Sequence, residues 1–125
     1  MSRQRVVPYG SWKSPVTSEM AASATQLTEV TIAAGEIFWR EHRPEEQGRF
    51  TIMKRTTDGQ TMELTLPPFN ARTTVHEYGG GTFVVADDSV YFSNFCDQRI
   101  YRVARGREAE PVTPKVNMRY ADGVI

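Results

Sequence analysis

The sequence has a single cysteine, no net charge and no long apolar run. Because Cys96 has no partner in the chain, an internal disulfide is excluded, which favours a reducing compartment. Fifteen basic residues balance fifteen acidic ones, so the positive surface that binds nucleic-acid phosphates is not expected. No stretch approaches the roughly 20 apolar residues that span a bilayer, and the N-terminus lacks the apolar core of a signal peptide. We therefore expect a cytoplasmic protein with no nucleic-acid or membrane partner.

Most of the chain has the residue pattern of β-strands. Pro8 and Pro15 interrupt the first part of the chain, and residues 18–27 carry a short helical signal. From residue 28 onward, β-branched and aromatic residues recur in short runs separated by turn residues. Asp58 and Gly59 supply a hairpin turn, since glycine tolerates the positive φ that such a turn needs. The expected strands cover residues 29–33, 36–42, 49–56, 61–66, 82–86, 89–94, 99–104 and 110–113.

The strands recur as two similar units. Ile37 aligns with Val90 at an offset of 53 positions, and Ile52 aligns with Ile100 at an offset of 48. A period of about 50 residues with four strands per unit is typical of β-propeller blades, while a β-sandwich of hairpins would also give regularly spaced strands. We predict an all-β fold of antiparallel four-stranded blades in an incomplete β-propeller, preceded by an extended or short helical segment.

This pattern divides the chain into three parts. Residues 1–27 form an N-terminal extension, residues 28–117 form about two blades, and residues 118–125 begin a third blade. Repeat units bury their faces against neighbouring units, and open sheet edges invite pairing with other strands. The isolated chain is therefore expected to be marginally stable or to associate with itself.

Seven motifs occur in order over nearly the whole chain. They are residues 9–15 (YGSWKSP), 43–49 (RPEEQGR), 67–72 (PPFNAR), 75–81 (VHEYGGG), 91–95 (YFSNF), 97–101 (DQRIY) and 119–123 (RYADG). Together they resemble the beginning of the bacterial dipeptidyl aminopeptidase/acylaminoacyl peptidases, which belong to the prolyl oligopeptidase family of serine peptidases. Two positions depart from the family pattern: Gln47 stands where glycine is expected, and Cys96 stands where a small residue such as alanine is usual.

The resemblance implies a role that this chain would share only in part. Family members run on for several hundred residues and complete a propeller and an α/β-hydrolase domain with the catalytic serine, aspartate and histidine. Their propeller covers the active site and restricts access to short, flexible peptides. By resemblance, this chain forms the N-terminal part of such a propeller, with peptides and the hydrolase domain as partners and without a cofactor. The alternative is a non-enzymatic β-rich interaction module that self-associates.

The chain itself offers no nucleophile elbow of the Gly-x-Ser-x-Gly type. Ser11 follows Gly10, but Tyr9 and Lys13 occupy the outer glycine positions. A Ser-His-Asp triad also needs a scaffold that this sequence does not contain. We therefore expect no catalytic residue, and no peptidase activity, in this chain alone.

The candidate functional residues are His76, Glu77 and Tyr78. By resemblance they lie at or near the innermost strand of a blade, where they would line the substrate channel and help to orient peptides. A structural hydrogen-bond network between blades is the alternative. His76 and Glu77 also begin the zinc motif His-Glu-x-x-His, but position 80 is glycine rather than histidine, so no metal site is expected.

Gly79, Gly80 and Gly81 are expected to be structural. A phosphate-binding loop would need a helix after the glycines, whereas residues 82–86 are a predicted strand. Glycines at this point would let the first strand of a blade lie close to the propeller axis, or let a bulge form. Trp12 is expected either to anchor the N-terminal segment to the hydrolase domain or to cover the propeller edge. The aromatic residues expected to pack between the blades are Phe38, Trp39, Tyr91, Phe92 and Tyr101.

Overall fold

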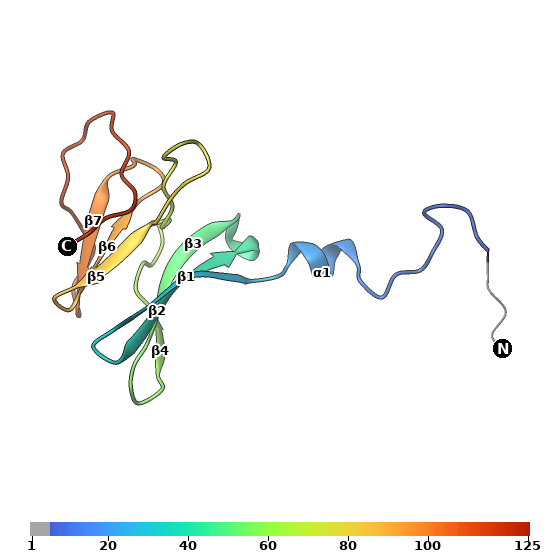
Figure 1. The fold of residues 1–125 in the computed structure, drawn as a ribbon, viewed down its shortest axis with the longest axis horizontal. Coiled ribbons are helices and arrows are strands. Elements are labelled where there is room, and N and C mark those ends of the chain that lie inside the picture. Colours follow the sequence, from blue (N-terminus) through green and yellow to red (C-terminus); the bar gives the residue numbers. More distant parts are fainter. Residues whose placement is uncertain (1–5) are drawn as a thin grey trace.

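The computed structural model describes residues 6–125 and consists mainly of two antiparallel four-stranded sheets (Figure 1). Strands adjacent in sequence are hydrogen-bonded neighbours in both sheets. Such a meander of four strands is the architecture of a propeller blade, and the predicted all-β fold is confirmed. The strands are β1 (Gln26–Ala33), β2 (Glu36–Arg43), β3 (Arg49–Arg55) and β4 (Thr61–Glu63) in the first sheet, and β5 (Phe83–Ala86), β6 (Ser89–Ser93), β7 (Ile100–Ala104) and β8 (Glu110–Pro111) in the second.

The outer strands of the two sheets end in the same way. The amide of Ile52 donates a hydrogen bond to the side-chain oxygen of Thr65 (2.8 Å), and the amide of Ile100 donates one to that of Thr113 (3.0 Å). A hydroxyl therefore takes the place of a strand carbonyl, and β4 and β8 end before the predicted limits. The same offset of 48 positions relates both residues of the first pair to those of the second, so the predicted repeat holds at this point.

The hairpin turns use residues that tolerate a left-handed backbone. Gly59 has a φ of +88° in the turn between β3 and β4, as the Asp58-Gly59 pair predicted. In the turn between β5 and β6, Asp87 and Asp88 have φ values of +47° and +59°. Aspartate is among the few non-glycine residues that adopt this conformation readily, so the turn needs no glycine.

The core lies between the two sheets. Phe38 of β2 is 4% exposed and Phe92 of β6 is 1% exposed. Trp39 and Tyr91 are their neighbours along these strands and point to the opposite faces, where they are only half-buried. Within residues 6–125 these two aromatics lie outside the buried cluster, whereas Tyr101 packs against it. The prediction that aromatics pack between the blades is therefore confirmed only for Phe38, Phe92 and Tyr101. The buried apolar residues are Phe38, Ile52, Ala71, Val90, Phe92 and Val103.

A polar bridge joins the innermost strands of the two sheets. The carboxylate of Glu29 accepts hydrogen bonds from the amide (2.7 Å) and the hydroxyl (3.0 Å) of Thr82. It also pairs with Arg40 at 2.9 Å, and Arg40 donates to the Thr82 hydroxyl. The register shift between Thr28 and Thr31 turns Glu29 toward the second sheet with a φ of +50°. Because Thr82 is buried, its amide needs this partner.

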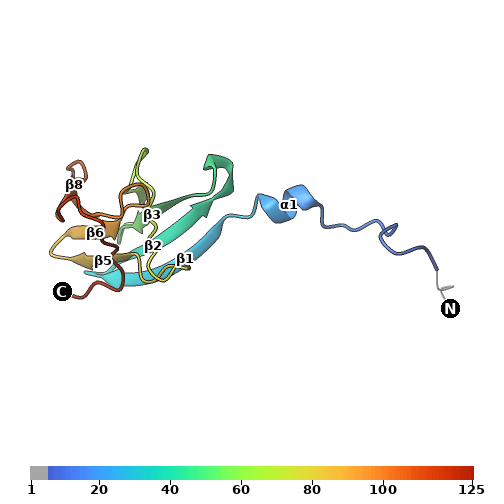
Figure 2. The same cartoon turned by 90° about the horizontal axis from the view of Figure 1, so that it is seen from above.

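Residues 6–25 stand away from both sheets (Figures 1 and 2), and none of them is buried. Their one helix, α1 (Ser18–Ala22), begins after Thr17, whose hydroxyl accepts a hydrogen bond from the Met20 amide. It ends before the predicted limit at residue 27, because Gln26 already pairs with β2. Residues 1–5 of the predicted extension lie outside the described residues. Within residues 6–125, no helix combines the length and apolar character needed to cross a membrane.

The last residues of the chain pack beside the start of β5. The amide of Asp122 donates to the carbonyl of Gly81 (2.9 Å), and the hydroxyl of Ser93 donates to the carbonyl of Tyr120 (2.8 Å). Residues 118–125 form no strand within the described chain. Their assignment to a third blade, like the boundaries at residues 27 and 117, stays a prediction.

Candidate functional site

The loop of residues 73–79 leads into β5 and carries the three candidate residues, His76, Glu77 and Tyr78. Thr73, at its start, is 2% exposed. The amide of Thr74 donates to the side chain of Gln98 (2.9 Å), in the connection between β6 and β7. The amide of Gly79 donates to the carbonyl of Val75 (2.9 Å) and closes the loop. The loop is therefore held at both ends, and its tip is free to present side chains.

The three candidate side chains are exposed at this tip. His76 and Glu77 have φ values of +54° and +67°, a conformation that costs a non-glycine residue about 1 kcal/mol or more. The rings of His76 and Tyr78 stack with centroids 5.8 Å apart, and Tyr78 is 88% exposed. Because all three side chains are exposed, they do not form the buried network between blades that was the alternative interpretation.

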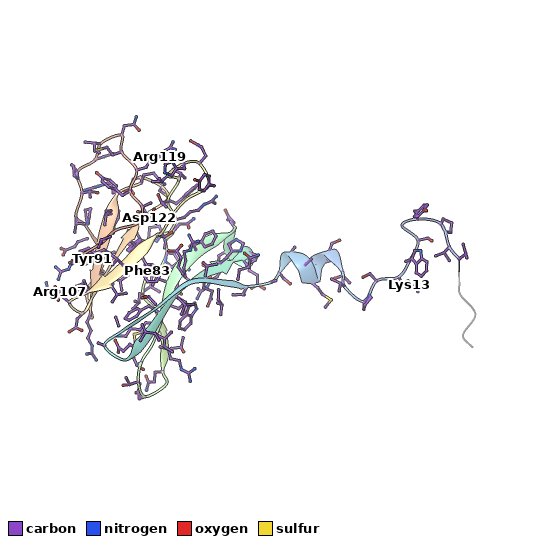
Figure 3. The ribbon with its side chains drawn as sticks, viewed as in Figure 1. Lys13, Phe83, Tyr91, Arg107, Arg119 and Asp122 are labelled. Carbon is purple, nitrogen blue, oxygen red and sulfur yellow. The ribbon has the colours of Figure 1, made fainter. Side chains whose placement is uncertain are left out.

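Glu77 pairs with Arg119, which is labelled in Figure 3 beside the second sheet. The guanidinium of Arg119 donates to the Glu77 carboxylate (2.9 Å) and to the carbonyl of Thr74 (3.0 Å). The two side chains are 47% and 86% exposed, so solvent limits the pair to about 1 kcal/mol or less. The contact links the loop to the segment that follows the second sheet.

Gly80 and Gly81 lie against Asp122. A Cβ atom at Gly80 would come within 2.9 Å of the Asp122 carboxylate and of the Ala121 side chain, and one at Gly81 would come within 2.8 Å of the same carboxylate. The amide of Gly81 uses this space to donate to Asp122 (2.8 Å). The glycines thus permit a close approach of two backbones, and β5 rather than a helix follows them.

Arg72, which directly precedes this loop, was not among the predicted site residues. Its guanidinium carbon lies 5.0 Å from the ring centre of Phe95 and 5.9 Å from that of Phe50. The side chain is exposed, and it has no ion pair or side-chain hydrogen bond within residues 6–125. Its place at the end of the motif PPFNAR is the one sequence signal that points to it.

Solved structures resemble this chain over nearly its whole length. A puromycin-hydrolysing peptidase of Mycobacterium tuberculosis is 38% identical over 94% of this chain, with a TM-score of 0.79. A puromycin hydrolase is 31% identical over 95% of it, with a TM-score of 0.80. The resemblance to peptidases of the prolyl oligopeptidase family is thereby confirmed. It spans about a fifth of the length of these two structures, since it covers 20% of each. No protein-family model and no curated protein matches it.

This propeller segment also has a cavity of about 570 Å³ between its two sheets. It opens at the end that carries the β1–β2, β5–β6 and β7–β8 turns, and none of the three candidate residues lines it. Its walls are mainly apolar, with charged side chains at the rim. The lining includes Phe38, Leu64, Val85, Val90 and Val103, together with Glu36, Lys54, Asp87, Asp88 and Arg107.

A cluster of ion pairs stabilises the first blade. Arg49, which is 8% exposed, donates to the carboxylate of Glu63 (2.6 Å), and Arg43 donates to its other oxygen (2.8 Å). Burial raises the pKa of Glu63, but hydrogen bonds from Arg49, Thr51 and Arg43 outweigh it and lower the pKa below the usual range. This carboxylate is therefore ionised and structural.

The two histidines of the segment have different settings. The ring of His42 lies 4.7 Å from that of Phe50, with a buried Nδ1 that has no partner within the described residues. His76 stacks on Tyr78, as described above. Neither histidine is hydrogen-bonded to a serine within residues 6–125. That part of the chain also contains no group of three or more His, Cys, Asp or Glu side chains suited to a metal ion.

Proposed function

We propose that this chain supplies two blades of the propeller of a prolyl oligopeptidase-family peptidase. In this role it supports a hydrolase domain and limits its substrates to short peptides or aminoacyl compounds, while bond cleavage takes place outside this chain. The relatives named above hydrolyse puromycin, and a related compound is the substrate class that we infer for the whole enzyme.

The observation that carries this proposal is the burial of equivalent residues in the two sheets. Ile37 and Val90 occupy matching positions, but Ile37 is 38% exposed and Val90 is 3% exposed. Phe38 is buried, whereas its counterpart Tyr91 is half-buried. Each sheet buries the face that meets the other. The opposite face of the first sheet is exposed, whereas that of the second is half-buried. Two neighbouring wedges of a larger ring would have this pattern.

The open face of the first sheet is the stronger part of this pattern. Ile32 is the register partner of Ile37, so both lie on the face opposite Phe38. Ile32 is 71% exposed, and Val30 is 66% exposed nearby in the same strand. A cluster of exposed β-branched residues on a sheet favours contact with a further protein surface, and in this proposal that surface is another blade.

The N-terminal segment supports contact with a second domain. Trp12 is 66% exposed and Tyr9 fully so, on a segment that stands clear of the sheets (Figure 2). Large aromatic side chains are common anchors in protein interfaces. We propose that this segment contacts the hydrolase domain, and that His76, Glu77 and Tyr78 contribute to the path of the peptide.

Reconstitution tests the proposal. A related peptidase lacking the region equivalent to this chain would be mixed with the 125-residue chain, and hydrolysis of an aminoacyl chromogenic substrate would be measured. We expect activity only in the mixture, and Ile37→Lys should reduce it about tenfold by placing a charge in the blade contact. In the same assay, Glu77→Gln should change the KM for longer peptides more than that for dipeptides.

Val116→Lys is the matched control, since Val116 is 47% exposed but lies outside both sheets. It should leave the recovered activity unchanged. Hydrolysis by the chain alone that a serine-directed inhibitor abolishes would contradict the proposal. An equal loss of activity in both lysine variants would contradict the proposed contact between the open face of the first sheet and another blade.

A second candidate function is a self-associating β module, which the exposed Val30, Ile32 and Ile37 also favour. In this case the open face of the first sheet would bind another copy of the chain. Sedimentation of the chain over a range of concentrations distinguishes the two. A stable dimer that Ile37→Lys dissociates, without reconstitution of the relative, would favour self-association.

A further inference from the structure

We propose that Arg72 binds a carboxylate of a peptide at the end of the sheets that carries the 73–79 loop. This inference rests on the proposed function, because it assumes that peptides pass this end. It extends that function by naming the chemical group that the blades bind and the side chain that binds it.

Two aromatic rings hold the guanidinium of Arg72. The ring of Phe95 lies 5.0 Å from its central carbon, and the ring of Phe50 lies 5.9 Å from it. A guanidinium within about 6 Å of a ring centre is attracted to the ring face. Because the rings limit the rotamers of the long side chain, less entropy is lost when it binds a ligand.

The backbone on both sides of Arg72 is fixed. Ala71 is fully buried, and its amide donates to the carbonyl of Phe50 (2.8 Å). The amide of Arg72 donates to the carbonyl of Ser93 (3.0 Å), and Phe95 is tied to Asn70 by a further backbone hydrogen bond (2.8 Å). The guanidinium and both of its ring neighbours thus belong to one rigid unit, as a binding site requires.

Arg72 carries a positive charge that the described residues do not balance. Carboxylates on the surrounding elements pair with other groups: Glu29 with Arg40, and Glu77 with Arg119. Asp97 accepts hydrogen bonds from Tyr101 (2.7 Å) and from Asn94 (3.0 Å).

The charge of Arg72 also acts on Arg40, whose guanidinium lies 4.5 Å from the centre of the same Phe50 ring. Burial lowers the pKa of Arg40, the charge of Glu29 opposes that change, and the charge of Arg72 lowers the pKa further. An anion beside Arg72 would relieve this repulsion between like charges.

A carboxylate, which has two acceptor oxygens, fits this site better than a group with a single acceptor atom. The guanidinium presents parallel N–H donors that match the two oxygens of a carboxylate. The ring of Phe95 is 38% exposed, so it offers apolar contact to the side chain next to the bound group. Either the C-terminal carboxylate of a peptide or an aspartate or glutamate side chain could provide the oxygens.

Titrations of the ¹⁵N-labelled chain, followed by NMR through the Arg72 side-chain and backbone signals, test the proposal. The probes are acetyl-trialanine with a free carboxylate, the same peptide as its amide, and the amide with a central aspartate. We expect the free acid to bind about fivefold more tightly than the plain amide, as an exposed charge-assisted contact allows. The aspartate peptide shows which source of carboxylate is preferred.

Arg72→Gln should remove the difference between acid and amide, and Arg72→Lys should retain only part of it because the forked donors are lost. Arg107→Gln is the control. Arg107 is exposed in the turn between β7 and β8, far from Arg119, which marks the end with the 73–79 loop (Figure 3). Equal affinities for acid and amide, no binding of either, or equal effects of Arg72→Gln and Arg107→Gln would overturn the inference. If Arg72→Gln unfolds the chain, Arg72→Lys alone decides.

The reconstitution experiment separates this inference from the proposed function. Recovered activity without carboxylate binding at Arg72 would contradict the Arg72 site and leave the proposed function intact. Failure of reconstitution together with carboxylate binding would remove the proposed function and leave the site as a property of this chain.

Discussion

The first and second sheets have the same strand order but are stabilised by different interactions. In the first, Arg43, Arg49 and Glu63 form a partly buried ionic cluster beside β4. In the second, Arg99 donates to the carbonyl of Thr113 (2.6 Å and 2.9 Å) and forms no ion pair within residues 6–125. The hydroxyl that ends each outer strand is nevertheless the same. The repeat therefore preserves backbone geometry more strictly than it preserves side-chain chemistry.

The two sheets also differ in which of their faces is covered. Each packs one face on the other, so Trp39 lies on the uncovered face of the first sheet while its counterpart Phe92 is buried between the sheets. The comparison shows that the exposure of an aromatic residue depends on the neighbouring blade and not on its own strand.

The largest expected effect comes from truncating this aromatic pair. Phe92→Ala should lower the free energy of unfolding by about 3 kcal/mol, because it leaves a cavity between the sheets. Trp39→Ala should cost only about 1 kcal/mol, since its ring is already partly in solvent. Urea unfolding of the chain measures both. Equal losses of stability would show that the two faces are equally packed and would contradict the difference in burial described here.

The ionic cluster of the first sheet gives the next largest effect. Glu63→Gln should lower the free energy of unfolding by about 2 kcal/mol at pH 7, because two arginines lose their shared carboxylate. The folded pKa of Glu63 lies below the unfolded value. Its contribution is therefore complete above about pH 5 and is lost progressively as the pH falls below the unfolded value of about 4.3.

Thermal unfolding of the chain and of Glu63→Gln from pH 7 to 3 checks this dependence. The two melting curves should converge at the acid end. A difference that persists unchanged at pH 3 would mean that the substitution acts through packing and not through charge.

The smallest expected difference concerns the hydroxyls that end the outer strands. Thr65→Val should cost about 1.5 kcal/mol, since Thr65 is fully buried and the amide of Ile52 loses its acceptor. Thr113→Val should cost about 0.5 kcal/mol, because Thr113 is half-buried and water can replace its hydroxyl. Amide hydrogen exchange at Ile52 and Ile100 reports the two sites separately. A larger effect at Ile100 would reverse the order.

Much of the fold could be predicted because its signals are local. The Asp58-Gly59 turn and the alternation in β3 depend on residues within a few positions of each other. The end of β4 was predicted too late because the competing acceptor, the hydroxyl of Thr65, is recognisable only once β3 lies beside it. The half-burial of Trp39 and Tyr91 was not predicted for a similar reason, since alternation identifies two faces but not the one that is covered.

The candidate site, like the fold, could be predicted only in part from the sequence. The motif that contains His76, Glu77 and Tyr78 was visible in the sequence, but the exposure of these side chains follows from a loop held by Gln98. Arg72 was missed because Phe50 and Phe95, its ring neighbours, are more than 20 positions from it in each direction.

The sequence by itself determined the strands, the turns and the two-unit repeat, because hydrophobic alternation and turn residues act over a few positions. Only the tertiary structure decided which faces are buried, which carboxylate bridges the sheets and which guanidinium has no counter-charge among residues 6–125. These features depend on groups brought together from distant positions in the chain, as with Glu29 and Thr82. Residue type alone therefore does not determine burial or pairing.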